Sequence, residues 1–123
     1  MDRPLPNSID AERIVLGGIL VDPERIHGIA EHILPDDFYR DAHRGIFKVL
    51  VSLKDKGEPV DIVTVQEEFR SRGDLEDMGG TEYLAALIDS VPTAANIEYY
   101  AGIVKEKAIL RRLIDECIQI ASL

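Results

Sequence analysis

The sequence predicts an all-α fold, and three observations carry that prediction. Helix-start and helix-stop residues punctuate almost the whole chain. Between them, apolar residues recur at the three- and four-residue spacing of one-sided helices. The one β-branched run, residues 60–65, is interrupted by Asp61 and Thr64, which argues against a strand. We therefore expect a compact orthogonal bundle of about six helices, ending in a long C-terminal helix.

Length and composition favour one domain over residues 1–123. A chain of this size buries a core without metal or disulfide support, and its single cysteine suits a reducing compartment. The 14 Lys and Arg against 23 Asp and Glu give a net charge of −9, which opposes direct contact with nucleic-acid phosphates. The longest apolar run, residues 14–21, is too short for a membrane span. These features predict a soluble, cytoplasmic domain.

The first predicted helix is expected to form the buried centre of the bundle. Asn7 or Ser8 caps it, and its second half is nearly all apolar. Gly17 and Gly18 together cost a helix about 1–2 kcal/mol relative to alanines. Close approach of a neighbouring helix would offset that cost. Before this helix, residues 1–7 are expected to be a flexible start.

Four helical segments and one turn are expected next. A second helix begins at the Asp22-Pro23 pair and ends before Pro35, so it covers residues 23–34. A single turn over 35–39 follows, and a third helix over 41–56 stops at a glycine. Two further helices are expected over 61–72 and 81–91. The apolar stripe of the second helix comprises Ile26, Ile29, Ala30, Ile33 and Leu34.

The last segment, residues 96–123, predicts a helix more than twice the average length. Asn96 caps it, and no helix-breaking residue follows. Its apolar residues change face along its length, and a small domain cannot cover both faces. We expect the second face to pack on another subunit or on a missing part of a longer chain. The first stripe is Ile97, Tyr100, Ala101, Val104 and Ala108, and the second is Leu110, Leu113, Ile114, Cys117 and Ala121.

The sequence shows no catalytic or metal-binding pattern. Neither Gly17-Gly18 nor Gly79-Gly80 is followed by the Lys-Ser/Thr of a phosphate loop. The three histidines, His27, His32 and His43, have no cysteine partner at zinc-ligand spacing. We interpret His43, at a helix start, as a structural hydrogen-bonding residue. Cys117 lies on an apolar stripe and is interpreted as an inert packing residue.

Charged pairs are interpreted mainly as solvated surface. Asp36-Asp37 and Glu67-Glu68 are adjacent in sequence, so neither pair can act as a carboxylate dyad by itself. On the long helix, four basic residues alternate with Glu106. They are either a solvated face or an ion-pairing strip for an acidic partner subunit. The four are Lys105, Lys107, Arg111 and Arg112.

A series of short motifs carries a resemblance that covers essentially the whole chain. In order, they are Ser8-Ile9-Asp10-Ala11-Glu12 with Val15-Leu16-Gly17-Gly18; Asp37-Phe38-Tyr39 with Ala42-His43; Gly57-Glu58-Pro59-Val60-Asp61 with Val63-Thr64; Gly79-Gly80-x-x-Tyr83-Leu84; Pro92-Thr93-Ala94-Ala95-Asn96-Ile97; Tyr100-Ala101-x-Ile103-Val104; and Leu110-Arg111-Arg112-Leu113-Ile114. In this order and spacing, the chain resembles the N-terminal domain of bacterial replicative DNA helicases of the DnaB family. Asp10 stands where Glu is usual, a conservative departure.

The resemblance implies a scaffold without catalysis of its own. The parent would be an ATP-dependent helicase that unwinds DNA at the replication fork, with ATP and Mg bound in a missing RecA-like motor domain. No cofactor is then expected in this fragment. The resemblance also implies dimers arranged as a trimer of dimers in a hexamer collar. It implies docking of the primase C-terminal domain and, in some bacteria, of a helicase loader. Residues 96–123 would pair with a further helix as a hairpin.

Six residues are the candidates for partner contacts. Tyr83 is the first candidate for a primase contact, by resemblance to an aromatic at this motif position; the alternative is that it packs on its own domain. Tyr99 and Tyr100 are further candidates. The apolar candidates for self-association, which a monomer would leave exposed, are Ile118, Ile120 and Leu123. An alternative function is the helicase-binding helical domain of primase, or another acidic helical adaptor.

Overall fold

The computed structural model describes residues 4–92 and 96–123. Within these ranges the chain contains α-helices, 3₁₀ turns and no strand, so the predicted all-α class is confirmed. The elements are α1 (Ile9–Val21), η1 (Pro23–Arg25), α2 (Ile26–Ala30), η2 (Pro35–Asp37), α3 (Asp41–Asp55), α4 (Ile62–Arg72), α5 (Gly80–Asp89) and α6 (Ile97–Ala121). Residues 1–3 of the expected flexible start and 93–95 of the fifth motif lie outside the described residues.

Most helix boundaries follow from capping residues that the sequence displays. The Ser8 side chain accepts a hydrogen bond from the Ala11 amide at the start of α1. At α4, Asp61 and Thr64 cap each other's backbone amides, which confirms a helix where the β-branched run could have suggested a strand. The Asn96 side chain caps α6.

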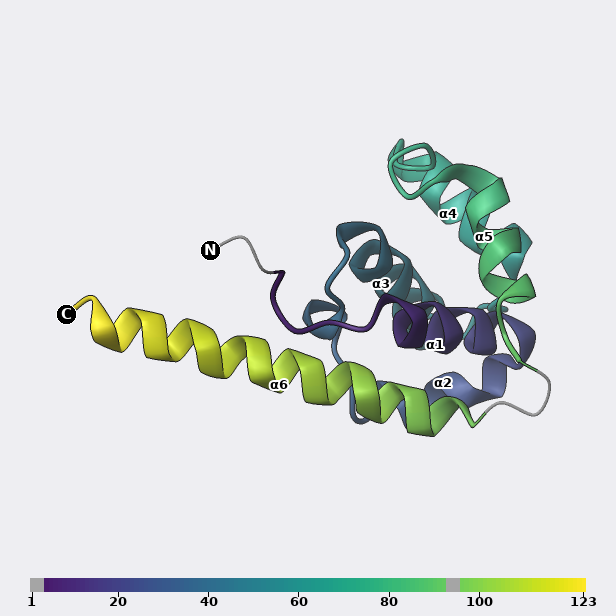
Figure 1. The fold of residues 1–123 in the computed structure, drawn as a ribbon. Coiled ribbons are helices and arrows are strands. Elements are labelled where there is room, and N and C mark those ends of the chain that lie inside the picture. The colour runs from purple at the N-terminus through teal and green to yellow at the C-terminus, as the bar shows by residue number, and fades with distance from the viewer. Residues whose placement is uncertain (1–3, 93–95) are drawn as a thin grey trace.

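The expectation that the first helix is buried and central is confirmed. A Cβ atom on Gly17 would lie 2.1 Å from the backbone oxygen of Leu87 in α5. A Cβ on Gly18 would lie 2.3 Å from the Cδ1 of Ile97 in α6. Both neighbouring helices therefore pack directly against the α1 backbone, as Figure 1 shows for α1 above α6. The tight packing offsets the conformational cost of two helical glycines.

The predicted second helix, residues 23–34, is wrong in length. The structure has a 3₁₀ turn and a five-residue helix, α2, which ends at Ala30. Leu34, assigned to the buried stripe, is 60% exposed. The exposure of Leu34 has a local reason: a residue before proline avoids the helical region, and Leu34 is extended, with φ −109° and ψ 158°. Ile33 still reaches the core.

Helix α6 is the longest element and extends beyond the rest of the domain. Its 25 residues span about 37 Å. The first half lies along α1, and its buried residues are Ile97, Ala101, Val104 and Ala108. From residue 115 to the end, every residue is exposed. Figure 1 shows this end projecting away from the other helices. None of the described helices is both long and apolar enough to cross a bilayer.

Candidate protein-interaction surfaces

A buried polar network joins α1, α3 and α5. Glu12 is 1% exposed and His43 is fully buried. The Glu12 Oε1 lies 2.7 Å from the His43 Nδ1, and the His43 Nε2 lies 2.6 Å from the Tyr83 hydroxyl. The other Glu12 oxygen accepts the Tyr39 amide at 2.7 Å. Three of the sequence motifs that are far apart in the chain therefore meet at this network.

For an ionised Glu12 and a neutral His43, the hydrogen bonds of the network have one consistent direction. An ionised Glu12 carboxylate only accepts, so the His43 Nδ1 donates to it. In a neutral imidazole the Nε2 then accepts, and the Tyr83 hydroxyl donates its proton inward. An Arg40 guanidinium nitrogen donates to the same Tyr83 oxygen at 3.2 Å. The interpretation of His43 as a structural hydrogen-bonding residue is confirmed.

Tyr83 is half-buried and is held by its own domain. Its ring stacks on His43, with centroids 5.9 Å apart and planes at 14°. Gly79, with φ +106°, is the residue before α5, and a Cβ there would lie 2.8 Å from the Tyr83 Cβ. This contact explains the spacing of the Gly79-to-Tyr83 motif. The hydroxyl is engaged inside the domain, and the Arg40 guanidinium lies over the ring, 5.6 Å from its centroid. A primase contact through the exposed part of the ring stays a prediction.

Asp37 forms a second buried cluster, which corrects its assignment to solvated surface. Its side chain is 0% exposed, whereas Asp36 is exposed as expected. One carboxylate oxygen accepts the Leu34 amide at 2.8 Å and lies 3.2 Å from the Lys105 Nζ. The other oxygen pairs with Arg112. The tertiary fold brings α6 over η2, and burial with two cations replaces hydration of the carboxylate.

Three of the four basic residues of α6, Lys105, Arg111 and Arg112, therefore bind residues of their own domain. Besides the ion pairs of Lys105 and Arg112, Arg111 donates to the Asp37 carbonyl at 2.6 Å and to the Pro6 carbonyl at 2.8 Å. Burial lowers the pKa of the Arg111 guanidinium from its usual value. The Pro6 contact ties one residue of the predicted flexible start to α6.

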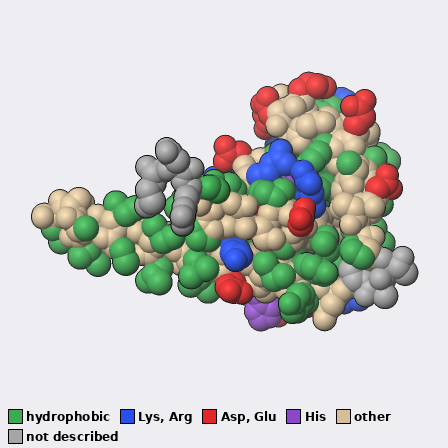
Figure 2. Space-filling model, in the orientation of Figure 1, with side chains coloured by type: hydrophobic (Ala, Val, Ile, Leu, Met, Phe, Trp, Pro, Cys, Tyr) green, Lys and Arg blue, Asp and Glu red, His purple; other side chains and the backbone are tan. Residues whose placement is uncertain are grey.

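The outer face of α6 is an exposed apolar surface. Successive helical residues are about 100° apart around the axis, so this face lies on the side opposite the buried stripe. Leu113 is 59% exposed and Ile120 is 66% exposed. The predicted change of face is confirmed for Leu110, Leu113 and Cys117, whereas Ile114 of the predicted stripe is half-buried. The outer face comprises Ile109, Leu110, Leu113, Cys117 and Ile120. Figure 2 shows hydrophobic side chains along this projecting part of the molecule.

The other candidates on α6 have different environments. Tyr99 shares the azimuth of the outer face and is 64% exposed, whereas Tyr100 is half-buried. Their rings meet edge to face at 5.5 Å. Ile118 and Leu123 are exposed but lie at other azimuths. Cys117 does not pack within this domain as interpreted, because α6 has already left the core at that position.

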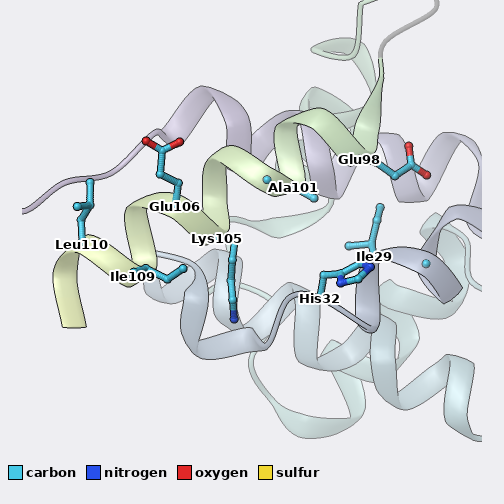
Figure 3. A pocket seen from close by; sticks show the side chains of 10 residues that line it. Ile29, His32, Glu98, Ala101, Lys105, Glu106, Ile109 and Leu110 are labelled. Carbon is cyan, nitrogen blue, oxygen red and sulfur yellow. The ribbon is translucent and has the colours of Figure 1, made fainter. Parts of the chain in front are cut away.

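An apolar groove of about 410 Å³ lies between α2 and α6. Gly28 and Gly102 line it, and a Cβ at either position would meet no atom within 4 Å. Ile109 and Leu110 belong both to the groove and to the outer face, so the two surfaces are continuous. Figure 3 shows Ile29 and His32 on one side of the groove and α6 residues on the other. By contrast, acidic side chains gather at the α4–α5 end of the molecule in Figure 2.

Comparisons with known proteins agree with the motifs. The family model of the DnaB-like helicase N-terminal domain matches residues 4–106. The replicative DNA helicase DnaB of Geobacillus stearothermophilus is 50% identical over 120 residues, which are 98% of this chain and 26% of that protein. The chain thus spans about a quarter of that relative's length.

Solved structures give the same fold. The N-terminal domain of DnaB helicase from Mycobacterium tuberculosis superposes with a TM-score of 0.92 at 44% identity, covering 97% of this chain and 86% of that one. The N-terminal domain of DnaB helicase from Helicobacter pylori, described with its interactions with primase, gives 0.75 at 25% identity, covering 92% and 88%.

The fold, the internal networks and the outer face define an all-α domain with an exposed apolar helix face. The likeness to helicase N-terminal domains over nearly the whole chain decides between the helicase and the primase alternatives in favour of the helicase. The chain belongs to the DnaB-like helicase N-terminal domain family.

Proposed function

We propose that this chain is the N-terminal scaffold of a bacterial replicative DNA helicase, supporting assembly of a hexamer collar and docking of primase without catalysis of its own. The observation that carries the proposal is the two-sided character of α6. Its buried residues, Ile97, Ala101, Val104 and Ala108, form an inner stripe against the domain. Its outer face presents apolar side chains to a partner. A helix of this kind joins the domain to a second body.

Self-association is the proposed role of the outer face. It includes the exposed Ile120, and the exposed Ile118 and Leu123 of the helix end lie beside it at other azimuths. In the parent protein, residues 96–123 would pair with a further helix as a hairpin, and dimers would form a trimer of dimers. The acidic balance of the domain would limit non-specific capture of nucleic acid and leave the helical faces to proteins.

Primase docking is the second proposed role. It is supported by the Helicobacter pylori N-terminal domain, whose structure is described with its interactions with primase. Tyr83 is the first contact candidate because the internal network holds its ring in one orientation. Tyr99 and Tyr100 offer further aromatic surface on α6. The partner would be the C-terminal domain of primase, with a helicase loader as a further partner in some bacteria.

The remaining activities are proposed for the rest of the parent protein. A RecA-like motor domain would bind ATP and Mg, translocate on DNA and unwind the fork. The parent would work in the bacterial cytoplasm, at the replisome. This division agrees with relatives that are about four times as long as this chain.

Light scattering across concentration tests self-association. We expect the mass of the wild-type chain to rise with concentration, and Leu113→Glu and Ile120→Glu to remain monomeric, because a charge on the outer face must be desolvated on contact. Val63→Glu is the matched control, since Val63 is a similarly exposed aliphatic residue on α4. Ile118→Glu and Leu123→Glu test the candidates at other azimuths. A strictly monomeric wild type, or an equal loss in Val63→Glu, contradicts the assignment.

Calorimetric titration with the primase C-terminal domain tests docking. If the Tyr83 ring is the contact, Tyr83→Ala weakens binding and Tyr83→Phe largely preserves it, because the phenylalanine keeps the ring and loses only the internal hydroxyl. Tyr99→Ala and Tyr100→Ala locate the remaining aromatic contacts. Circular dichroism of each variant checks that the helices remain folded. An affinity that Tyr83→Ala leaves unchanged removes Tyr83 from the docking site.

A further inference from the structure

The point at which α6 leaves the domain is fastened by one residue of η2. Asp37 is bound through its carboxylate by Lys105 and Arg112 and through its carbonyl by Arg111. These three basic residues occupy two successive turns of α6, immediately before its fully exposed end. The Arg111 guanidinium also lies over the Tyr39 ring, 5.4 Å from its centroid. We call this set of contacts the Asp37 latch.

The inner stripe alone leaves the direction of the outer half of α6 weakly defined. Its last buried residue is Ala108, whose small side chain offers little surface to resist tilting of the helix. The latch contacts lie on both sides of that position, at residues 105, 111 and 112. Ion pairs and hydrogen bonds are directional, so they fix the orientation of the helix more closely than apolar contact does.

We infer that Asp37 is a positioning residue, which sets the direction in which α6 projects and so presents the outer face to its partner. Asp37 itself need not touch that partner. The inference rests on the proposed function only for the use made of the outer face. The orientation of α6 can be measured in the chain by itself, whether or not it associates.

The three ion-paired side chains of the latch differ in exposure, so the ion pairs can be removed without leaving an unpaired buried charge. Asp37 is fully buried, whereas the Lys105 and Arg112 side chains are 35% and 50% exposed. Removing the carboxylate charge therefore releases two cations that can be hydrated. An asparagine at this position still offers an oxygen to the Leu34 amide, and Arg111 binds the backbone carbonyl. Asp37→Asn thus removes the ion pairs of the latch and retains the η2 turn.

Distance measurement between two spin labels tests the orientation. One label is placed on α3 through Lys48→Cys and the other on the projecting half of α6 through Gln119→Cys, in a Cys117→Ser background. Gln119 lies at an azimuth away from the outer face, and both sites are exposed. Dilution with unlabelled chain removes distances between molecules. We expect one narrow distribution of label-to-label distances in the doubly labelled chain with Asp37 unchanged. In Asp37→Asn we expect a broader, shifted distribution.

Matched variants separate the latch from general damage. Asp36→Asn changes the neighbouring exposed carboxylate and is expected to leave the distribution narrow. Arg112→Gln removes one side of the latch from α6 and is expected to broaden it, which gives a second route if Asp37→Asn does not fold. Narrow distributions in both latch variants, or equal broadening in Asp36→Asn, overturn the inference.

Association is measured on the same variants by light scattering. Weaker association in Asp37→Asn with a broadened distance distribution links orientation to assembly. A wild-type chain that remains monomeric while Asp37→Asn broadens refutes the proposed use of the outer face and leaves the latch in place. The two failures are therefore distinguishable.

Discussion

The inner and outer halves of α6 share one helical geometry but have opposite surroundings. In the inner half, Ala101 and Val104 are buried against the domain, and residues on the other side of the helix are exposed. In the outer half, Leu113 and Ile120 lie on the side opposite the buried stripe, whereas Ile118 and Leu123 lie at other azimuths. The side continuing that stripe carries Asp115 and Gln119. The comparison teaches that the apolar pattern of one helix changes face where the helix leaves its own domain.

The largest expected change in stability comes from a substitution that disrupts the packing of α1 against the inner half of α6. Gly18→Ala places a methyl group against the Ile97 side chain of α6, and we expect a loss of about 2–3 kcal/mol in the free energy of unfolding. Gly102→Ala is the control on the open side of α6, and it should stabilise by roughly 0.5–1 kcal/mol because alanine favours a helix. Urea denaturation measures both. Equal effects at the two glycines would contradict the assignment of the two sides.

A matched pair of truncations sharpens the contrast between the halves. Val104→Ala removes buried methyl groups from the inner half and should cost about 1–2 kcal/mol of unfolding free energy. Ile120→Ala removes more carbon from the outer face, yet the monomer should change by less than about 0.5 kcal/mol. The measurement is denaturation at a concentration where light scattering shows monomer. A larger loss at Ile120 would show that the outer half packs within its own domain.

The smallest expected effect concerns the ion pair at the start of the inner half. The pKa of Glu98 is lowered mainly by a hydrogen bond from its own backbone amide and next by one from the Arg25 side chain. A carboxyl whose pKa is lowered by folding adds stability above its unfolded pKa and loses it as the pH falls through the folded value. Glu98→Gln should therefore lower the melting temperature slightly near neutral pH and not at strongly acidic pH. Both groups are largely exposed, so added salt should reduce the difference. A difference that persists in acid would point to packing instead of charge.

Local chemistry explains the parts of the fold that could be predicted. The Asp61–Thr64 capping box and the Asn96 cap each act over three residues, so the sequence displays both partners together. The wrong assignment of Leu34 to the buried stripe also has a local cause, because a proline disfavours the helical conformation of the residue before it.

The networks could not be predicted because their partners are distant in the chain. Glu12 and His43 are 31 residues apart, and Asp37 and Arg112 are 75 residues apart. Helical periodicity relates only residues a few positions apart, so it does not predict contacts between such distant residues. One signal was present for Glu12: it lies four residues before Leu16 and seven before Ile19, so a helical wheel places it on the buried face of α1. Asp37 gave no comparable signal, because its burial depends on α6.

The unbroken course of α6 has a mechanical consequence. From Ala108 to Ala121 the helix extends about 20 Å without an interruption, so it behaves as a lever whose short arm lies against α1. A tilt of about 10° at the base would carry the tip through about 3.5 Å, a little more than the rise of two helical residues. Force applied by a partner at the tip would reach the closest-packed helix of the domain through a single rigid rod.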